Sequence, residues 1–319
     1  MITKQFDVIT VGELNVDLIL NKIQGFPEVG KEILADNMTL TLGSSSAIFA
    51  SNLSSLGAKV GFIGKVGKDM FGELVIAELL AKGVDSSLLI KDSALNTGVT
   101  VVLNYLEDRA NVTYPGAMES LTINDITKDK LKAARHMHFA SLYLQEGIRS
   151  DIVELFKRAK EAGLTTSLDT QWDPSEKWEF DYKNLLPYVD VFMPNKGELL
   201  NLTKSESLDE AIAKIKDFSN TTIIKNGSKG SILVQKDCEI LERPAYLNTN
   251  VVDAIGAGDS FNAGFISKFV QGWALEECQD FGNLTGAINT TESGGTTAFS
   301  SKAEIVRKAK DVFDKEINL

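Results

Sequence analysis

The chain has 319 residues, of which 43% are hydrophobic and 24% charged, a composition typical of globular proteins. Its formal net charge of −11 argues against nucleic acid or an anionic membrane as the main partner. The two cysteines, Cys238 and Cys278, have no metal-like spacing, and no apolar run approaches the roughly 18 residues of a membrane span. The first residues do not resemble a signal peptide, so we expect a cytoplasmic enzyme.

Short apolar runs alternate with helical patterns along the whole chain. Strands are predicted at residues 6–11, 60–63, 136–140, 165–168, 189–193 and 222–225. Helices are predicted at residues 71–82, 149–162, 208–217, 258–271 and 275–291. This alternation is typical of an α/β fold in which a mostly parallel sheet carries helices on both faces. Because no linker or repeat interrupts it, we expect residues 1–319 to form a single domain.

Two segments break this alternation. Residues 18–41 are polar and extended, and residues 99–105 alternate like a half-buried strand. A turn at Glu107-Asp108-Arg109 sends the second segment back through residues 112–114. We expect a small β-lid over the active site, formed from about residues 15–41 and 98–115. The alternative is a surface hairpin with no role in binding.

A glycine-rich turn precedes the helix predicted at 258–271. Gly256, Ala257 and Gly258 are small enough for a ligand to lie against their backbone. Their N–H groups, at the positive end of a helix dipole, favour an anion such as phosphate. Asp259 at this junction has two interpretations. It caps the helix, or it is a general base that deprotonates a hydroxyl attacking a phosphoryl group.

The stretch from Asp253 to Asp259 resembles the signature of the ribokinase (PfkB) family of carbohydrate kinases. Further stretches resemble this family's other motifs in the same order, at residues 12–17, 42–48 with 56–57, 64–72, 195–198 and 225–230. The resemblance extends over nearly the whole chain. It implies a ribokinase-like fold, ATP and Mg²⁺ as cofactors, and phosphorylation of a small sugar with Asp259 as base and an anion hole at Gly256–Gly258. In this family the lid often also makes a dimer contact.

The resemblance also assigns residues on the nucleotide side. Asn195 and Glu198 would orient Mg²⁺ through its waters, whereas the residues alone also fit a capping box. Lys225 stands where the family usually carries a small hydroxyl residue, and it either reaches a phosphate or lies solvated along the rim. Gly227 and Gly230 would allow the backbone to approach ATP.

Two further residues have roles implied by the resemblance alone. Asn283 stands at an adenine-side contact, although a polar surface position is equally consistent with the sequence. Asp253 matches the ligand of an activating K⁺, but the threonine that usually follows it is Ala254 here.

On the sugar side, Asn15 and Asp17 would bind hydroxyl groups, with a turn cap as the alternative for Asp17. Gly43 and Ser44 replace a Gly-Gly pair that is common in relatives. Ribokinases proper carry Lys and Asn at two further positions, which here are Ser45 and Ile48. Ribose would therefore lose polar contacts, and we expect a different small neutral sugar.

A second stretch bears on sugar acids as substrates. Fructokinase-like and ketodeoxygluconate-kinase-like relatives carry an Asp-x-Asn-x-Arg stretch that lacks its arginine in the segment 169–173. A sugar acid therefore has less support. The alternatives are a nucleoside kinase of the same fold and a catalytically silent sugar-binding or regulatory protein.

The sequence does not assign a role to four other residues. His136 and His138 alternate within a predicted strand, so we expect one to face the core and the other the opposite face. Whether Tyr143 or Gln145 lines the sugar pocket also remains open.

Overall fold

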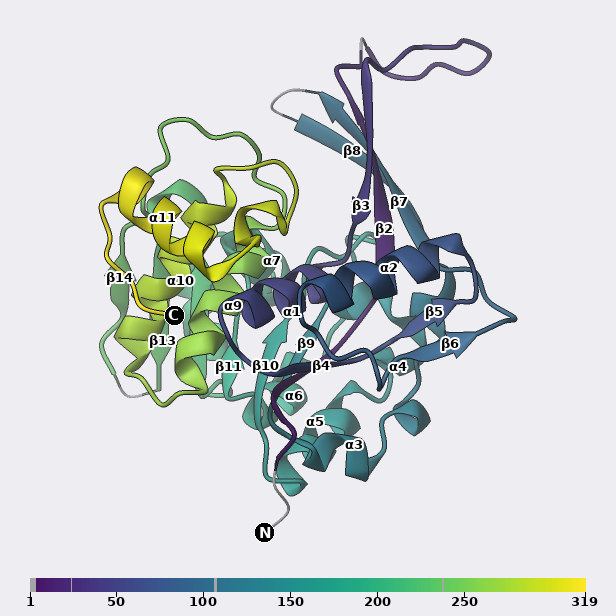
Figure 1. The fold of residues 1–319 in the computed structure, drawn as a ribbon. Helices are drawn as coiled ribbons and strands as arrows, with labels where there is room; N and C mark the ends of the chain where they lie inside the picture. Colours follow the sequence, from purple (N-terminus) through teal and green to yellow (C-terminus); the bar gives the residue numbers. More distant parts are fainter. Residues whose placement is uncertain (1–3, 24, 106–107, 237) are drawn as a thin grey trace.

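The computed structural model describes residues 4–23, 25–105, 108–236 and 238–319. Its largest sheet has the strand order β14–β13–β12–β11–β10–β9–β1–β4 (Figure 1). The six strands from β12 to β4 are parallel, and β13 and β14 are antiparallel additions at one edge. The bounds are β1 Phe6–Val11, β4 Val60–Ile63, β9 Ala134–Ala140, β10 Thr165–Asp169, β11 Val191–Phe192, β12 Thr221–Lys225, β13 Ser231–Gln235 and β14 Leu241–Arg243.

Helices cover both faces of this sheet, as predicted, and each face has its own hydrophobic cluster. The helices that contribute to one cluster are α1 (Ser45–Ser55), α2 (Met70–Ala81), α9 (Ala257–Phe269), α10 (Leu275–Asn289) and α11 (Lys302–Phe313). The opposite cluster includes residues of α3 (Lys128–Lys132), α4 (Glu146–Arg149), α5 (Ile152–Glu161), α6 (Tyr182–Leu185), α7 (Lys196–Thr203) and α8 (Leu208–Ile215). Within the described ranges, no helix is both long and apolar enough to cross a membrane.

The differences from the predicted elements have simple causes. Helix α1 was not predicted because residues 46–53 are all buried, so its sequence shows no polar face. The helix predicted at 149–162 is α5, which begins three residues later because the separate short helix α4 ends at Arg149. The strand predicted at 189–193 is shorter, because β11 pairs with its neighbours only at Val191 and Phe192.

A second sheet projects from the body of the molecule at the top of Figure 1. Its strands are β3 (Asn37–Leu42), β2 (Asn15–Asn21), β7 (Gly98–Tyr105) and β8 (Asp108–Tyr114), in that order. These strands fall within the two segments predicted to form a lid. The expected turn at Glu107 lies outside the described residues. A small third sheet pairs β5 (Lys65–Gly67) with β6 (Ile90–Asp92).

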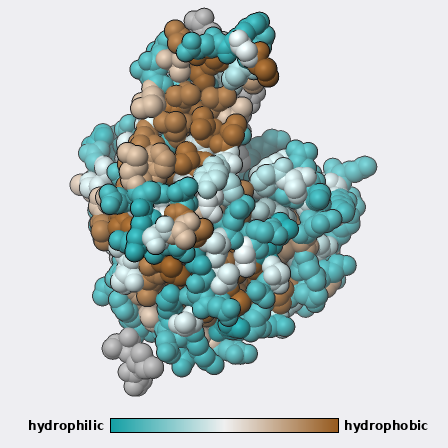
Figure 2. Space-filling model, turned by 90° about the vertical axis from the view of Figure 1, so that its right-hand side faces the viewer, coloured by the Kyte–Doolittle hydropathy of each residue, from teal (hydrophilic) through white to brown (hydrophobic). Residues whose placement is uncertain are grey.

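The two faces of the second sheet differ in polarity. Cross-strand pairing puts one row of side chains on the same face, comprising Thr41, Asp17, Thr100 and Thr113. The neighbouring rows, on the opposite face, comprise Leu40, Leu18, Val101 and Val112, then Met38, Leu20, Leu103 and Ala110. Figure 2 shows hydrophobic residues gathered over this projecting part of the molecule. One face of the sheet is therefore largely polar, and the other is an apolar surface.

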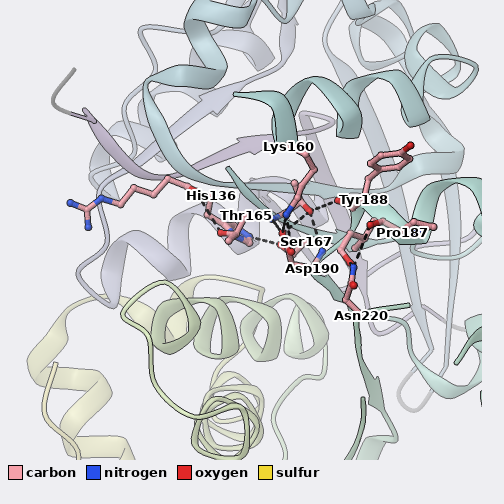
Figure 3. Close-up of polar contacts among 11 residues, drawn as sticks. His136, Lys160, Thr165, Ser167, Pro187, Tyr188, Asp190 and Asn220 are labelled. Atoms are coloured by element: carbon pink, nitrogen blue, oxygen red, sulfur yellow. Dashed lines mark hydrogen bonds and ion pairs between the residues drawn. The ribbon is translucent and has the colours of Figure 1, made fainter. Parts of the chain in front are cut away.

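Two buried histidines of β9 share one hydroxyl group. His136 Nε2 lies 2.7 Å from Ser167 Oγ and His136 Nδ1 lies 2.9 Å from Thr165 Oγ1 (Figure 3). His138 Nδ1 also lies 2.7 Å from Ser167 Oγ. The prediction that the two histidines face opposite sides is wrong, because residues two apart on a strand share a face. Burial lowers the pKa of both rings, that of His138 to about 3. Both are therefore neutral residues of the interior.

A second polar cluster connects α5 to the neighbouring strands. Lys160 Nζ lies 2.7 Å from Asp190 Oδ2, and the same carboxylate accepts the Thr166 N–H at 2.8 Å (Figure 3). This ion pair fixes the end of β10 at which the strand begins, opposite to the end where the site lies.

Candidate active site

A cavity of about 1060 Å³ is lined by residues from the carboxyl ends of the parallel strands. Segments following β1, β9, β10 and β11, and the last residue of β12, contribute Glu13, Ser141, Gln171, Asn195 and Lys225 respectively. Ligands of open α/β sheets bind at this edge, where neighbouring loops diverge. The polar face of the second sheet also lines the cavity, through residues 15, 17, 100 and 113.

Asp259 lies in the first turn of α9 and faces this cavity. The helix begins after Gly256, whose φ of 74° is left-handed, and no side chain caps its N-terminus. The Asp259 carboxylate is 7% exposed. Its Oδ1 accepts a hydrogen bond from Gln171 Nε2 at 3.0 Å, and no other hydrogen bond to this carboxylate is found among the described residues. A capping carboxylate would accept a backbone N–H of the first turn, and this one does not.

Burial and nearby charge change the proton affinity of Asp259. Removal from water raises its pKa, and the negative charge of Asp169 raises it further, to about 8. Lys225 opposes this effect with its positive charge. An aspartate whose pKa is raised into the neutral range in this way has the basicity required of a proton acceptor.

The residues before α9 leave room for a ligand against the backbone. Gly256 and Gly258 line the cavity. A Cβ on Gly256 would lie 2.7 Å from the Cα of Gly295, so a larger residue does not fit there. Ala257 does not line the cavity, and its N–H donates to the carbonyl of Ala254 at 3.2 Å. Of the three residues expected to form the anion hole, only the two glycines therefore line the cavity.

Lys225 and Asp169 form an ion pair beneath these glycines. Lys225 Nζ lies 2.5 Å from Asp169 Oδ2, and the two side chains are 11% and 0% exposed. Lys225 therefore does not lie solvated along the rim. Burial acts to lower the pKa of Lys225, but the charges of Asp169 and Glu198 outweigh it and raise that pKa. A Cβ on Gly258 would lie 3.6 Å from Lys225 Nζ, so the ammonium adjoins the first turn of α9.

Asp169 was not among the residues singled out for the site. It is the last residue of β10, and it also accepts a hydrogen bond from Asn262 Nδ2 at 2.5 Å. An acidic residue at the carboxyl end of a central parallel strand is the signal that could have identified it.

Asn195 and Glu198 form the capping box that the sequence allowed. The Asn195 side chain accepts the Glu198 N–H at 2.8 Å, and Glu198 accepts the Asn195 N–H at 2.8 Å. Both residues also line the cavity. Burial, with the charge of Asp169, raises the pKa of Glu198 to about 7. Each carboxylate oxygen keeps a lone pair for a second donor, so capping does not prevent contact with a hydrated cation.

The other nucleotide-side residues differ in their placement. Gly227 lines the cavity, whereas Gly230, with a φ of 95°, makes room for the carbonyl of Arg243. Asn283 is buried rather than on the surface, and its Nδ2 lies 3.4 Å from the carbonyl of Pro244. It does not line the cavity.

Asp253 holds two loops together. Its carboxylate accepts N–H groups of Ile255 at 2.9 Å and Gly294 at 3.0 Å. It does not line the cavity. The carboxylate is thus directed at the loops for which the family resemblance implies a K⁺ site.

On the sugar side, a hydrogen-bonded group lies at the base of the second sheet. Asn15 Nδ2 donates to Asp17 Oδ1 at 3.0 Å and to Thr100 Oγ1 at 2.9 Å. A Cβ on Gly43 would lie 2.2 Å from Asp17 Oδ1, so a larger residue there would displace this carboxylate. Ser44 caps α1 and, with Asn15 and Asp17, lines the cavity.

Glu13 was also missed, although it lies within the segment 12–17. It is 2% exposed, and its carboxylate accepts hydrogen bonds from Ser44, Ser46 and Ser141. Burial raises its pKa. Its carboxylate connects the segment after β1 to the start of α1 and to the loop after β9, a contact that depends on the fold rather than on sequence spacing.

The sequence left open whether Tyr143 or Gln145 lines the sugar pocket, and the structure places only Tyr143 in the cavity. Tyr143 lines the cavity, and its buried hydroxyl has no hydrogen-bond partner within the described part of the chain. Gln145 does not line the cavity and donates instead to the carbonyl of Ala140 at 2.7 Å. Ser45 and Ile48, which distinguish this chain from ribokinases, are lining residues.

Residues 5–302 match the model of the pfkB family carbohydrate kinases, and the chain belongs to this family. It is 27% identical to a probable fructokinase-4 of Arabidopsis thaliana, over 93% of this chain and 95% of that one. It is 26% identical to a 2-dehydro-3-deoxygluconokinase of Bacillus subtilis, over 94% of each chain. The protein is therefore a carbohydrate kinase, whose relatives act on different sugars.

Solved structures agree with this assignment. A ribokinase of Arabidopsis thaliana, complexed with ribose and ATP, has a TM-score of 0.81 and 25% identity over 95% of this chain and 98% of its own. A putative ribokinase II of E. coli, in complex with ATP and Mg²⁺, has a TM-score of 0.79 and 25% identity over 94% of this chain and 97% of its own. The predicted ribokinase-like fold is thus confirmed.

Proposed function

We propose that the protein transfers a phosphoryl group from ATP to a hydroxyl of a small neutral sugar, with Asp259 as the general base. One observation carries this proposal. The Asp259 carboxylate is buried at the start of α9, faces the cavity and caps nothing. A buried carboxylate with no capping bond needs another reason to be there, and proton transfer provides one.

The chain's own residues have distinct parts in this reaction. Asp259 accepts the proton of the attacking sugar hydroxyl as its oxygen bonds to the γ-phosphorus of ATP. The bond from that phosphorus to the bridging oxygen breaks, and ADP leaves. The N–H groups of Gly256 and Gly258, with the ammonium of Lys225, stabilise negative charge on the phosphoryl oxygens. Asn195 and Glu198 would hold Mg²⁺ through its waters. When bound, ATP supplies the phosphoryl group and Mg²⁺ neutralises part of its charge.

The charges around the sugar side favour a neutral substrate. Carboxylates dominate the lining, at positions 13, 17, 119, 146, 173, 198 and 259. Two cations line the described cavity: Lys225, which we assign to the phosphoryl group, and Arg149, which forms an exposed ion pair with Glu146. A sugar acid or sugar phosphate would therefore meet repulsion. Ile48 offers no hydrogen bond to a ribose hydroxyl, so we propose a hexose such as fructose.

An ADP-release assay with a substrate panel tests this proposal. The panel contains ribose, fructose, fructose 6-phosphate, ketodeoxygluconate and adenosine at equal concentration. We expect a neutral hexose to give the highest kcat/KM, with ribose more than about threefold lower, since one lost polar contact costs at least ~1 kcal/mol. Highest turnover with adenosine would support a nucleoside kinase. Absence of turnover with every compound would support a silent sugar-binding or regulatory protein.

We also propose that the chain acts as one domain with the second sheet as its lid. Asn15, Asp17 and Thr100 lie on the lid face that lines the cavity, so closure would bring them onto the sugar. The opposite face exposes Met38 and Leu40, at 66% and 36%, and is suited to pairing with a second copy. The K⁺ site at Asp253 remains a further proposal, tested by turnover in K⁺ against a bulky organic cation.

A further inference from the structure

Gln171 connects the ion pair to the proposed base. Its Nε2 donates to Asp169 Oδ2 at 3.2 Å and to Asp259 Oδ1 at 3.0 Å. Its backbone N–H also donates to Asp169 Oδ1, at 3.3 Å. The two N–H bonds of one carboxamide thus extend to two carboxylates from separate elements, the end of β10 and the start of α9.

The backbone at Gln171 is held in an unusual conformation. Its φ is 58°, a left-handed value that glycine adopts readily and glutamine does not. Such a residue persists where its surroundings fix it, and this occurs most often at functional sites. This backbone conformation, which directs the side chain toward Asp259, is a second observation that is independent of the hydrogen bonds.

We propose that Gln171 is a positioning residue that holds one oxygen of Asp259 and leaves the other oxygen directed to the sugar hydroxyl. Asp169 anchors Gln171, because Lys225 and Asn262 in turn fix the Asp169 carboxylate. This inference rests on the proposed function for its meaning in catalysis. The contact itself is testable without a sugar.

The amide N–H also favours the ionised form of Asp259. Hydrogen bonding to a carboxylate stabilises its charge and lowers its pKa. The other groups that act on Asp259 are Asp169 from β10, Lys225 from β12, Glu13 after β1 and Glu198 on α7. Removing the amide leaves these four in place, so the pKa of Asp259 should rise.

The test is an NMR titration of protein labelled with ¹³C at the aspartate carboxyl, with the Asp259 signal assigned by its loss in Asp259→Asn. In Gln171→Leu the midpoint of Asp259 should rise by at least about half a pH unit. Gln271→Leu, at an exposed glutamine in the turn after α9, is the matched control and should leave the midpoint unchanged. An unchanged midpoint in Gln171→Leu would overturn the proposal.

Gln171→Gly separates the side chain from the backbone. If Gln171 only completes a left-handed turn, glycine relieves the strain and leaves kcat and the Asp259 midpoint unchanged. If the amide positions the base, glycine and leucine should both lower kcat at least tenfold and move the acidic limb of the pH profile upward. Activity that survives Asp259→Asn would refute the base itself, whereas the titration would still report on the contact.

Discussion

Lys225 Nζ lies 2.5 Å from Asp169 Oδ2, and this buried ion pair adjoins Gly258 and, through Gln171, Asp259. A buried charge that loses its partner is costly, because its desolvation is no longer compensated. The same ammonium lines the cavity, where we propose that it stabilises a phosphoryl oxygen. The pair therefore has a structural part and a catalytic part, which different measurements can separate.

Lys225→Met should lower the free energy of unfolding by about 3–5 kcal/mol, because it leaves Asp169 buried and unpaired. The double variant Lys225→Met with Asp169→Asn should recover most of this loss but little of the activity. Denaturant unfolding and turnover assays measure the two effects. Lys229→Met, at an exposed position on the adjacent turn, is the control. Recovery of full activity in the double variant would show that Lys225 has no part in phosphoryl transfer.

Glu198→Gln should raise the Mg²⁺ concentration needed for half-maximal activity, since a neutral amide attracts hydrated Mg²⁺ less than a carboxylate does. Glutamine can still accept the Asn195 N–H, so the melting temperature should stay close to that of the wild type. The measurement is a Mg²⁺ titration at saturating ATP. An identical titration curve would leave Asn195 and Glu198 with the capping role alone.

Asp259→Asn should stabilise the free protein, and more so at pH 8.5 than at pH 5. The folded-state pKa of Asp259 is raised to about 8, so the folded protein binds this proton more tightly than the unfolded chain does. Stability from this group is present below about pH 4 and is lost as the pH rises through 8. Thermal unfolding across this pH range measures the difference. An equal shift at both pH values would contradict a raised pKa.

Met38→Glu and Leu40→Glu should convert a dimer to a monomer, because each places a charge on the apolar face of the second sheet. Thr39→Glu, on the opposite face of the same strand, should leave the dimer intact. Analytical ultracentrifugation distinguishes the states. A wild-type protein that sediments as a monomer at micromolar concentration would refute pairing through this face.

Local patterns predicted the six parallel strands and five of the helices, α2, α5, α8, α9 and α10, because buried runs and helical periods are read within a few residues. The glycine turn before Asp259 was also visible locally. The contacts that shape the site were not, since Lys225 is 56 residues from Asp169 and Gln171 is 88 residues from Asp259. Contacts between residues so far apart in the sequence can be predicted only when the order of the strands in the sheet is known. Whether Asp259 caps α9 likewise depended on where that helix begins.

The most direct test of the account is the turnover of Asp259→Asn with the best substrate of the sugar panel. Asparagine keeps the size of the side chain and an oxygen for the Gln171 bond, but it cannot accept the proton. The account predicts a fall in kcat of about 10²–10⁴, with ATP binding nearly unchanged. A variant that retains more than about a third of wild-type turnover would contradict the assignment of Asp259 as the general base.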